Sequence, residues 1–295
     1  MKRITGNVGV EIRGIDLATD LSADTVSAIR AAVVQHKVVF FRGQHGFDDA
    51  WQERFASRFG ALAPSHATLS GSAASPAILE LDYSTTQIRT DLWHTDASYQ
   101  LRPPLGTILR AVKMPPYGGD TAWANTATAY QSMPEELRAL ADSLWVVHTN
   151  TGDNAPYALN GEDGAAIRAQ RKEYLSREFF TKHPVVQLHP ESGERTLLLG
   201  QFFHRVVGWS IAASRDVYRL LQSYVVTPEN VVRWRWAEGD VAFWDNRATQ
   251  HYAVRDYGSQ GRTVHRITIA GDIPQSISGT RSESVGGDEF TVGIH

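Results

Sequence analysis

Short runs of β-branched and alternating apolar residues recur along most of this chain, and glycine or proline bounds many of them. Examples are VVFF at 38–41, TILRAV at 107–112, VAFW at 241–244 and VHRITI at 264–269. Such runs are typical of β-strands. Helical patterning interrupts them in only a few places, so strands and helices do not alternate as a doubly wound parallel sheet requires. The pattern predicts a mainly β protein, with antiparallel strands in a sandwich or jelly roll and helices outside.

Four segments carry a helical pattern. Ser22 is the expected N-cap of a helix that runs to about Gln35, and further helices fit 48–59, 127–141 and 212–224. Pro134 is expected to split the third of these helices. Residues 151–182 are polar and weakly periodic, so we expect an insertion there that is mobile or forms a lid. No repeat or linker marks a boundary, which favours one domain over residues 1–295.

Composition excludes several classes of function. The chain has no cysteine, which rules out thiol nucleophiles, disulfides, Cys-ligated zinc and iron–sulfur clusters. The 29 Lys and Arg are scattered among 32 Asp and Glu, so no basic stripe indicates a nucleic-acid partner. No apolar run has the length of a signal peptide or of a membrane span, and we therefore expect a cytoplasmic protein. A chain of 295 residues can bury its own core, so any metal would serve chemistry.

The triplet His94-Thr95-Asp96 is the first candidate for metal binding. Without cysteine, a catalytic transition metal must be held by histidine and carboxylate ligands. In a strand, residues i and i+2 point to the same face, so His94 and Asp96 would present an imidazole and a carboxylate side by side. Taken alone, the triplet fits equally well an ordinary strand with a surface aspartate and a hydrogen-bonded histidine.

The second candidate is His251, at the end of WDNRATQH, where an aromatic strand breaks into a polar turn. Two histidines and one aspartate can occupy one face of an octahedral metal and leave three positions for other ligands, as in the facial triad of non-haem Fe(II) oxygenases. A single histidine in an apolar context is also compatible with a packed, hydrogen-bonded core residue.

The third candidate is the pair Arg262 and Arg266 in GRTVHRITI. Being four residues apart, they share a strand face, opposite to that of His265. Two buried guanidinium groups need an anion, although a surface strand paired with acidic residues is the alternative. Fe²⁺, one carboxylate and two neutral imidazoles carry one positive charge, and a dicarboxylate such as 2-oxoglutarate with Arg262 would bring the site to neutrality. Arg266 could then hold the metal-side carboxylate of that cosubstrate or an anionic group of the main substrate.

The chain resembles the Fe(II)/2-oxoglutarate-dependent dioxygenases of the taurine dioxygenase family, and within it the alkylsulfatase-type members. The resemblance runs from about Val8 to Gly286 through HKVVFFRGQ, WHTD, PPYGGDTAWANTATAY, HPVVQLHPESGERTLL, RWRWAEGDVAFWDNRATQHYAVRDY and HRITIAGDIP. It implies a double-stranded β-helix, or jelly-roll, fold. It also implies Fe(II), 2-oxoglutarate and O₂ as the groups that carry the reaction.

Residue roles carry over by position. His94, Asp96 and His251 match the family's iron ligands, Thr121 and Arg262 match the residues that bind the distal carboxylate of 2-oxoglutarate, and Arg266 matches a second arginine that contacts cosubstrate or substrate. His66 lies near, and one residue displaced from, a histidine that contacts the sulfur oxyanion. Where relatives often have Val-Thr-Phe after HTD, this chain has Ala-Ser-Tyr, so Tyr99 is expected to border the substrate. Further candidates for the pocket wall are Trp93, Phe203 and Trp244.

The resulting prediction is hydroxylation of a small anionic substrate, first an alkyl sulfate with release of sulfate and an aldehyde, and second a sulfonate such as taurine or a natural-product intermediate. The resemblance also implies a homo-oligomer, a dimer or a tetramer. Two other classes stay open on the residues alone. A zinc hydrolase could use the same triad, but it would not need Thr121, Arg262 and Arg266. A non-catalytic jelly-roll binding protein would have no use for an intact triad.

Overall fold

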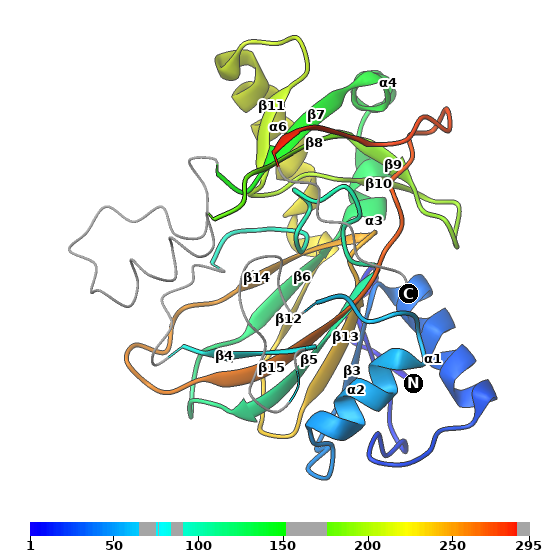
Figure 1. Ribbon diagram of the computed structural model, residues 1–295, viewed down its shortest axis with the longest axis vertical. Coiled ribbons are helices and arrows are strands. Elements are labelled where there is room, and N and C mark those ends of the chain that lie inside the picture. The colour runs from blue at the N-terminus through cyan, green and yellow to red at the C-terminus, as the bar shows by residue number, and fades with distance from the viewer. Residues whose placement is uncertain (65–74, 76, 84–90, 152–175, 288–295) are drawn as a thin grey trace.

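Strands dominate the computed structural model, which describes residues 1–64, 75, 77–83, 91–151 and 176–287 (Figure 1). The largest sheet has seven strands in the order β1-β2-β3-β13-β5-β15-β4. Their bounds are Lys2–Arg3 (β1), Val10–Glu11 (β2), Val38–Phe41 (β3), Val241–Asp245 (β13), Gly106–Lys113 (β5), Thr263–Ile269 (β15) and Ile78–Asp82 (β4). The pairings are antiparallel except for β2 with β3. The predicted mainly β fold with flanking helices is confirmed.

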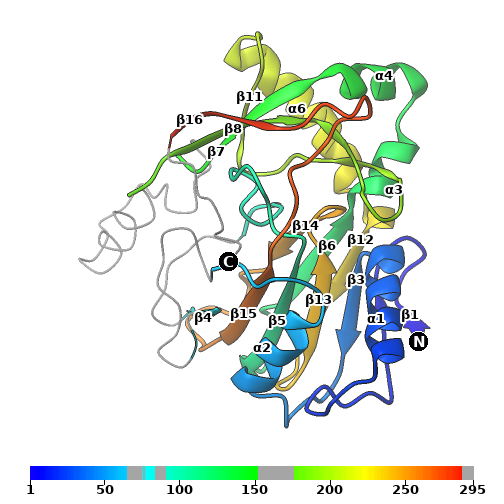
Figure 2. The same cartoon turned by 45° about the vertical axis from the view of Figure 1, so that its right-hand side comes forward.

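Both faces of the large sheet are covered, and β13 shows how its sequence achieves this. Val241 and Phe243 pack into one apolar cluster with the helices α1 (Ala23–His36) and α2 (Asp49–Ser57). Ala242 and Trp244 alternate to the other face and pack into a second cluster. A strand buried on both faces is read as a continuous apolar run, which is why VAFW lacks polar alternation. Figure 1 and Figure 2 show both helices lying against this sheet, α1 near β3 and α2 near β15.

A three-stranded sheet covers the second face. It consists of β12 (Val231–Trp234), β6 (Thr121–Asn125) and β14 (Thr249–Ala253) in that order. Phe40 of the large sheet stacks on Trp234 at a centroid distance of 4.1 Å and meets Trp123 edge-on at 5.2 Å. Such aromatic pairs contribute about 0.5–1.5 kcal/mol each beyond the area they bury. The space between these two sheets is where the candidate site lies.

A third layer lies beyond this sandwich. It contains a four-stranded sheet in the order β11-β7-β8-β16 and a hairpin of β9 and β10. The bounds are Phe203–Val206 (β11), Trp145–Thr149 (β7), Phe179–Pro184 (β8), Glu283–Gly287 (β16), Val186–Leu188 (β9) and Arg195–Leu197 (β10). Three helices and a short 3-10 turn accompany these strands: α3 (Thr126–Ser132), α4 (Glu135–Ser143), α6 (Ile211–Val225) and η1 (Pro228–Asn230).

The four expected helices are present, and the predicted N-cap Ser22 is confirmed. Ser22 accepts a hydrogen bond from the backbone N–H of Thr25, and Asp48 accepts one from Trp51 at the start of α2. Pro134 separates α3 from α4 because it supplies no N–H and its φ suits the residue before a helix. No helix in the described ranges is both long enough and apolar enough to span a bilayer.

The insertion expected over 151–182 ends earlier than predicted, because a strand begins at Phe179. Phe179–Pro184 form strand β8, which pairs with β7 on one side and β16 on the other. The weak periodicity of FFTKHP concealed a strand whose buried residues alternate with partly exposed ones. Residues 152–175 lie outside the described ranges.

Candidate metal and cosubstrate site

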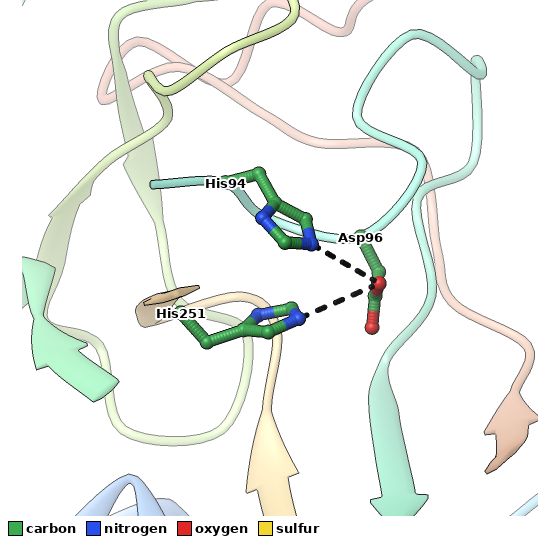
Figure 3. Close-up of side chains that lie close together, drawn as sticks. All are labelled: His94, Asp96 and His251. Atoms are coloured by element: carbon green, nitrogen blue, oxygen red, sulfur yellow. Dashed lines mark ion pairs between the residues drawn. The ribbon is translucent and has the colours of Figure 1, made fainter. Parts of the chain in front are cut away.

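Two histidines and one aspartate converge between the sheets. The backbones of His94 and His251 exchange both N–H···O bonds, at 3.0 and 2.8 Å, as an isolated antiparallel bridge. This bridge brings the two imidazole rings to a centroid separation of 4.0 Å. Oδ1 of Asp96 lies 4.0 Å from Nε2 of His94 and 3.8 Å from Nε2 of His251 (Figure 3). All three residues are buried, and one donor atom from each lies within 4.8 Å of the others.

The local structure around Asp96 differs from the expected strand. His94 is paired only through its single bridge, and the residues after Thr95 form a turn. Ala97 adopts a φ of 43° in that turn, in the left-handed region that L residues rarely occupy. The carboxylate of Asp96 therefore reaches His94 through a tight turn, and the alternation of a strand does not explain its position.

The three side chains suit a divalent transition metal. Nδ1 of His94 lies 2.7 Å from the carbonyl oxygen of Leu92, so Nδ1–H donates there and Nε2 keeps its lone pair. Burial lowers the pKa of His94 and lowers that of His251 to about 3, which keeps both imidazoles neutral. Burial alone would raise the pKa of Asp96, but the neighbouring Arg266 guanidinium and the hydrogen bond from Thr107 hold it well below its usual value. Neutral imidazoles and an ionised carboxylate are the protonation states that bind Fe(II) or Zn(II).

A second set of buried polar residues fixes Asp96. Thr107 of β5 donates its hydroxyl hydrogen to Oδ2 of Asp96 at 2.8 Å, and Asn246 donates to Oγ1 of Thr107 at 2.8 Å. Oδ1 of Asn246 accepts from Nε1 of Trp244 at 3.0 Å and faces the backbone N–H of Asp96 at 3.4 Å. The sequence analysis missed Thr107 and Asn246. The only available signal for Asn246 was its place in the polar turn that leads to His251.

Replacement of Asn246 by alanine is expected to weaken Fe(II) binding about 10- to 100-fold, because the support of a ligating carboxylate is lost. Anaerobic titration of the purified protein with Fe(II) measures this affinity. Asn7→Ala is the matched control, since the Asn7 side chain only donates to a distant surface carbonyl of Glu229. Equal affinities of Asn246→Ala and wild type would show that Asn246 does not orient the ligand.

Arg262 and Thr121 form a cationic, hydrogen-bonding end of the site. Each is 2% exposed. Nε of Arg262 donates to the carbonyl oxygen of Gly119 at 3.1 Å, and its Nη2 lies 3.5 Å from Oγ1 of Thr121. Gly119 has a φ of 69°, and a Cβ there would lie 3.2 Å from Cδ of Arg262, so glycine leaves room for the guanidinium stem. Within the described ranges, Arg262 makes no ion pair with a carboxylate, and a buried cation of this kind needs an anion.

The hydroxyl of Thr121 is also oriented to donate a hydrogen bond to an anion. Its Oγ1 accepts from Nε1 of Trp236 at 3.0 Å and faces Arg262 at 3.5 Å. A threonine hydroxyl has two acceptor positions and one hydrogen to donate. With both acceptor positions facing N–H donors, the hydrogen is directed to a further acceptor. Thr121 and Arg262 thus present donors to a carboxylate, and Trp236 orients the Thr121 hydroxyl. Trp236 is a residue that the sequence analysis did not single out.

Arg266 lies at the metal end of the site. Its Nη1 is 3.1 Å from Oδ1 of Asp96, the same oxygen that faces both histidines. In β15, Arg266 pairs with Leu109 and faces the small sheet, whereas His265 pairs with Arg110 and contacts Asp49 on the helix side. Arg262 is buried, and Arg266 is partly buried and contacts Asp96, which agrees with the expected placement of the two arginines on the face opposite to His265.

Of the two further residues expected to contact the substrate, the structure describes only Tyr99. Tyr99 is 2% exposed and packs against Phe179 and Phe202, with ring centroids at 5.4 and 4.8 Å. Phe202 meets the ring of His94 edge-on at 6.4 Å, so Tyr99 reaches the metal ligands through Phe202. His66 lies outside the described residues.

The other expected wall residues have mainly structural contacts. Phe203 packs instead on Tyr218 of α6 at 4.9 Å, so its neighbour Phe202 is the phenylalanine beside the site. Trp244 is 1% exposed and supports the ring of His251 at 4.8 Å, while Trp93 packs on Tyr252 at 5.6 Å.

A mainly β sandwich that buries two histidines, one aspartate and one arginine, with a second, partly buried arginine beside the aspartate, defines a candidate non-haem metal oxygenase. The model of the taurine catabolism dioxygenase TauD, TfdA family matches residues 1–268, and the chain belongs to this family. The predicted jelly-roll fold, the predicted enzyme class and the expected Fe(II), 2-oxoglutarate and O₂ are confirmed with it. A non-catalytic jelly-roll protein and a zinc hydrolase do not fit this membership.

Two characterised relatives and one solved structure extend the comparison. An alpha-ketoglutarate-dependent sulfate ester dioxygenase of Pseudomonas putida is 49% identical over 282 residues, covering 95% of this chain and 92% of the relative. An alkylsulfatase of Acinetobacter baylyi is 44% identical over 284 residues, covering 96% of this chain and 89% of the relative. The crystal structure of a taurine dioxygenase from Burkholderia xenovorans superposes with a TM-score of 0.81 at 34% identity, covering 97% of this chain and 94% of that one.

Proposed function

We propose that this chain hydroxylates the carbon next to the ester oxygen of an alkyl sulfate, in a reaction that consumes 2-oxoglutarate and O₂. The hydroxylated carbon then releases sulfate and becomes an aldehyde, while 2-oxoglutarate becomes succinate and CO₂. The relatives named for sulfate ester cleavage, at 49% and 44% identity, support the substrate class. The observation that carries the proposal is the buried Arg262, without a carboxylate partner in the described residues, beside Thr121 of β6, the strand that pairs with β14 and its candidate metal ligand His251.

The metal supplies the redox chemistry when it is bound, because Fe(II) with three protein ligands can activate O₂ for the decarboxylation of 2-oxoglutarate. We assign its binding to His94, Asp96 and His251. Thr121 and Arg262 bind the distal carboxylate of 2-oxoglutarate and so fix its orientation. Phe202 and Tyr99, packed edge-to-face at 4.8 Å, exclude water from the side of His94.

Charge balance assigns Arg266 to the sulfate. Fe²⁺, ionised Asp96, the dianion 2-oxoglutarate and the two arginines together leave one positive charge. A monoanionic sulfate ester neutralises it, which avoids a buried net charge. Arg266 sits beside Asp96, so an anion bound to its guanidinium would place the neighbouring C–H bond near the metal.

A panel of potential substrates tests the proposal. Alkyl sulfates, alkanesulfonates including taurine, and carboxylates are incubated with the aerobic enzyme, and succinate formation above the background without substrate is measured. Alkyl sulfates are expected to give equal amounts of succinate, sulfate and aldehyde. Succinate formation with sulfonates alone would contradict the sulfate assignment and favour the second candidate, a sulfonate hydroxylase, which the taurine dioxygenase structure supports. Sulfate release under argon would contradict both.

Three further features of the molecule belong to the same proposal. We propose that residues 1–295 form one domain with an insertion that starts near residue 151 and ends before strand β8 (Phe179–Pro184). We expect the protein to act in the cytoplasm. We also expect a homo-oligomer, a dimer or a tetramer, which light scattering of the purified protein would measure.

A further inference from the structure

A second pocket lies next to the metal site but shares none of its six side chains. Its volume is about 530 Å³, and its walls come from residues 102–104, from β9 and the residue after β10, and from the segment at 272–275 that follows β15. Thr95 and Asn246 also line it. Pockets of about 300–1,000 Å³ are of the size that holds small organic molecules.

The inner wall of this pocket is apolar. Pro103, Pro104 and Leu198 are buried, and Ile273 is partly buried. Gly271 brings the following segment close to this wall, because a Cβ at that position would lie only 2.0 Å from the carbonyl oxygen of Pro103. The two segments thus cross at van der Waals distance and close one side of the pocket. An apolar group of a ligand would be desolvated there.

The rim of the pocket is cationic. Arg102 and Arg281 line it together with a single carboxylate, that of Asp272, whose Oδ1 is 4.0 Å from Nη1 of Arg102. Arg281 makes no ion pair with any residue of the described ranges. A third guanidinium, that of Arg247, is already neutralised by Asp245 and Glu191, each at 2.7 Å. Two rim cations therefore face one carboxylate, which leaves a positive charge for an anion.

We propose that this pocket is a second binding site, distinct from the metal site, for an organic anion that has an apolar body and a sulfonate, sulfate or carboxylate head. The head binds Arg102 and Arg281, and the body packs on Pro103, Pro104 and Leu198. A ligand in the pocket also contacts Asn246, the residue that supports Asp96. A bound amphiphilic anion would therefore touch Asn246, the residue that holds the metal ligand Asp96 in place.

The probe for this site is 4-bromobenzenesulfonate, titrated calorimetrically into anaerobic protein loaded with Fe(II) and 2-oxoglutarate, so that no turnover occurs. The titration should show one class of binding that belongs to the pocket. The double variant Arg102→Gln/Arg281→Gln is expected to raise the dissociation constant of the probe for this class at least tenfold. Arg266→Gln is expected to leave that class unchanged, which separates the pocket from the metal site. Ile273→Trp, which fills the pocket, is expected to abolish the same class. Arg219→Gln, on the exposed surface of α6, is the control.

Unchanged binding by both the double variant and Ile273→Trp would overturn the proposal. Loss of all binding in Arg266→Gln would also overturn it, since the probe would then occupy only the metal site. A third outcome is an oligomer whose interface covers the rim of the pocket. In that case the wild type would not bind the probe, and the double variant would differ from it in mass by light scattering. That result would assign the pocket to a second copy of the chain and reject the small-molecule site.

Discussion

Asp96→Ala is expected to lower kcat/KM for an alkyl sulfate to below about 1% of the wild-type value, because one of three metal ligands is lost. The substitution also removes the carboxylate oxygen that accepts from Arg266 at 3.1 Å and faces both imidazoles. The Arg266 guanidinium would then lie beside two neutral imidazoles without the Asp96 carboxylate as its counter-charge. Succinate formation measured with saturating 2-oxoglutarate checks the result.

The matched control for Asp96→Ala is Asp216→Ala, whose side chain is 76% exposed on α6 and, among the described residues, pairs with Arg219 alone. Circular dichroism verifies that both variants fold. If Asp96→Ala kept more than about a tenth of the activity while Asp216→Ala kept all of it, the carboxylate would not be an essential ligand.

Arg262→Gln is expected to give the second largest effect, a rise in the KM for 2-oxoglutarate. Loss of one partner of a buried, hydrogen-bonded charge pair costs about 2–5 kcal/mol, which corresponds to roughly 30-fold or more in affinity. Arg262 is 2% exposed, so water does not replace the lost contact cheaply. The KM for the sulfate ester should change much less, because the substrate is assigned to Arg266.

Steady-state kinetics with 2-oxoglutarate and the sulfate ester varied separately measures this difference. Arg262→Lys is expected to recover part of the loss, since it keeps the charge but not the donors to Gly119 and Thr121. Arg219→Gln is the control for removal of an exposed arginine. An equal rise in both Michaelis constants would indicate a general disturbance of the site and would contradict a specific role toward 2-oxoglutarate.

The sequence predicted most of the fold because the signals for its elements are local. The cap residues Ser22 and Asp48 lie within three residues of the N–H groups that they accept from, and Pro134 acts on its own position. Strand β13 was visible because an apolar run is required wherever both faces of a strand are buried. The turn at Ala97 was missed because nothing in HTDAS indicates that His94 pairs with a residue 157 positions away.

The sequence indicated which types of residue form the site, but it did not indicate most of the contacts between them. Shared parity placed Arg262 and Arg266 on the inner face, and the chemistry of a chain without cysteine pointed to histidine and aspartate. Thr107 and Asn246 escaped because their roles depend on contacts between β5 and the turn after β13. Phe202 was passed over for Phe203 because a turn at 201–202 precedes β11, and alternation has no meaning there. Thr121 was found by family resemblance alone. Its contacts with Trp236 and Arg262 now explain how its hydroxyl can donate to a carboxylate.

The convergence of His94, Asp96 and His251 on one ferrous ion is the claim on which the account depends. Anaerobic addition of Fe(II) to the protein with saturating 2-oxoglutarate tests it directly. We expect a lilac absorption that saturates at one Fe(II) per chain and is absent in His94→Ala, Asp96→Ala and His251→Ala. An absorption of unchanged intensity in any of the three variants would contradict the assignment of that residue as a ligand.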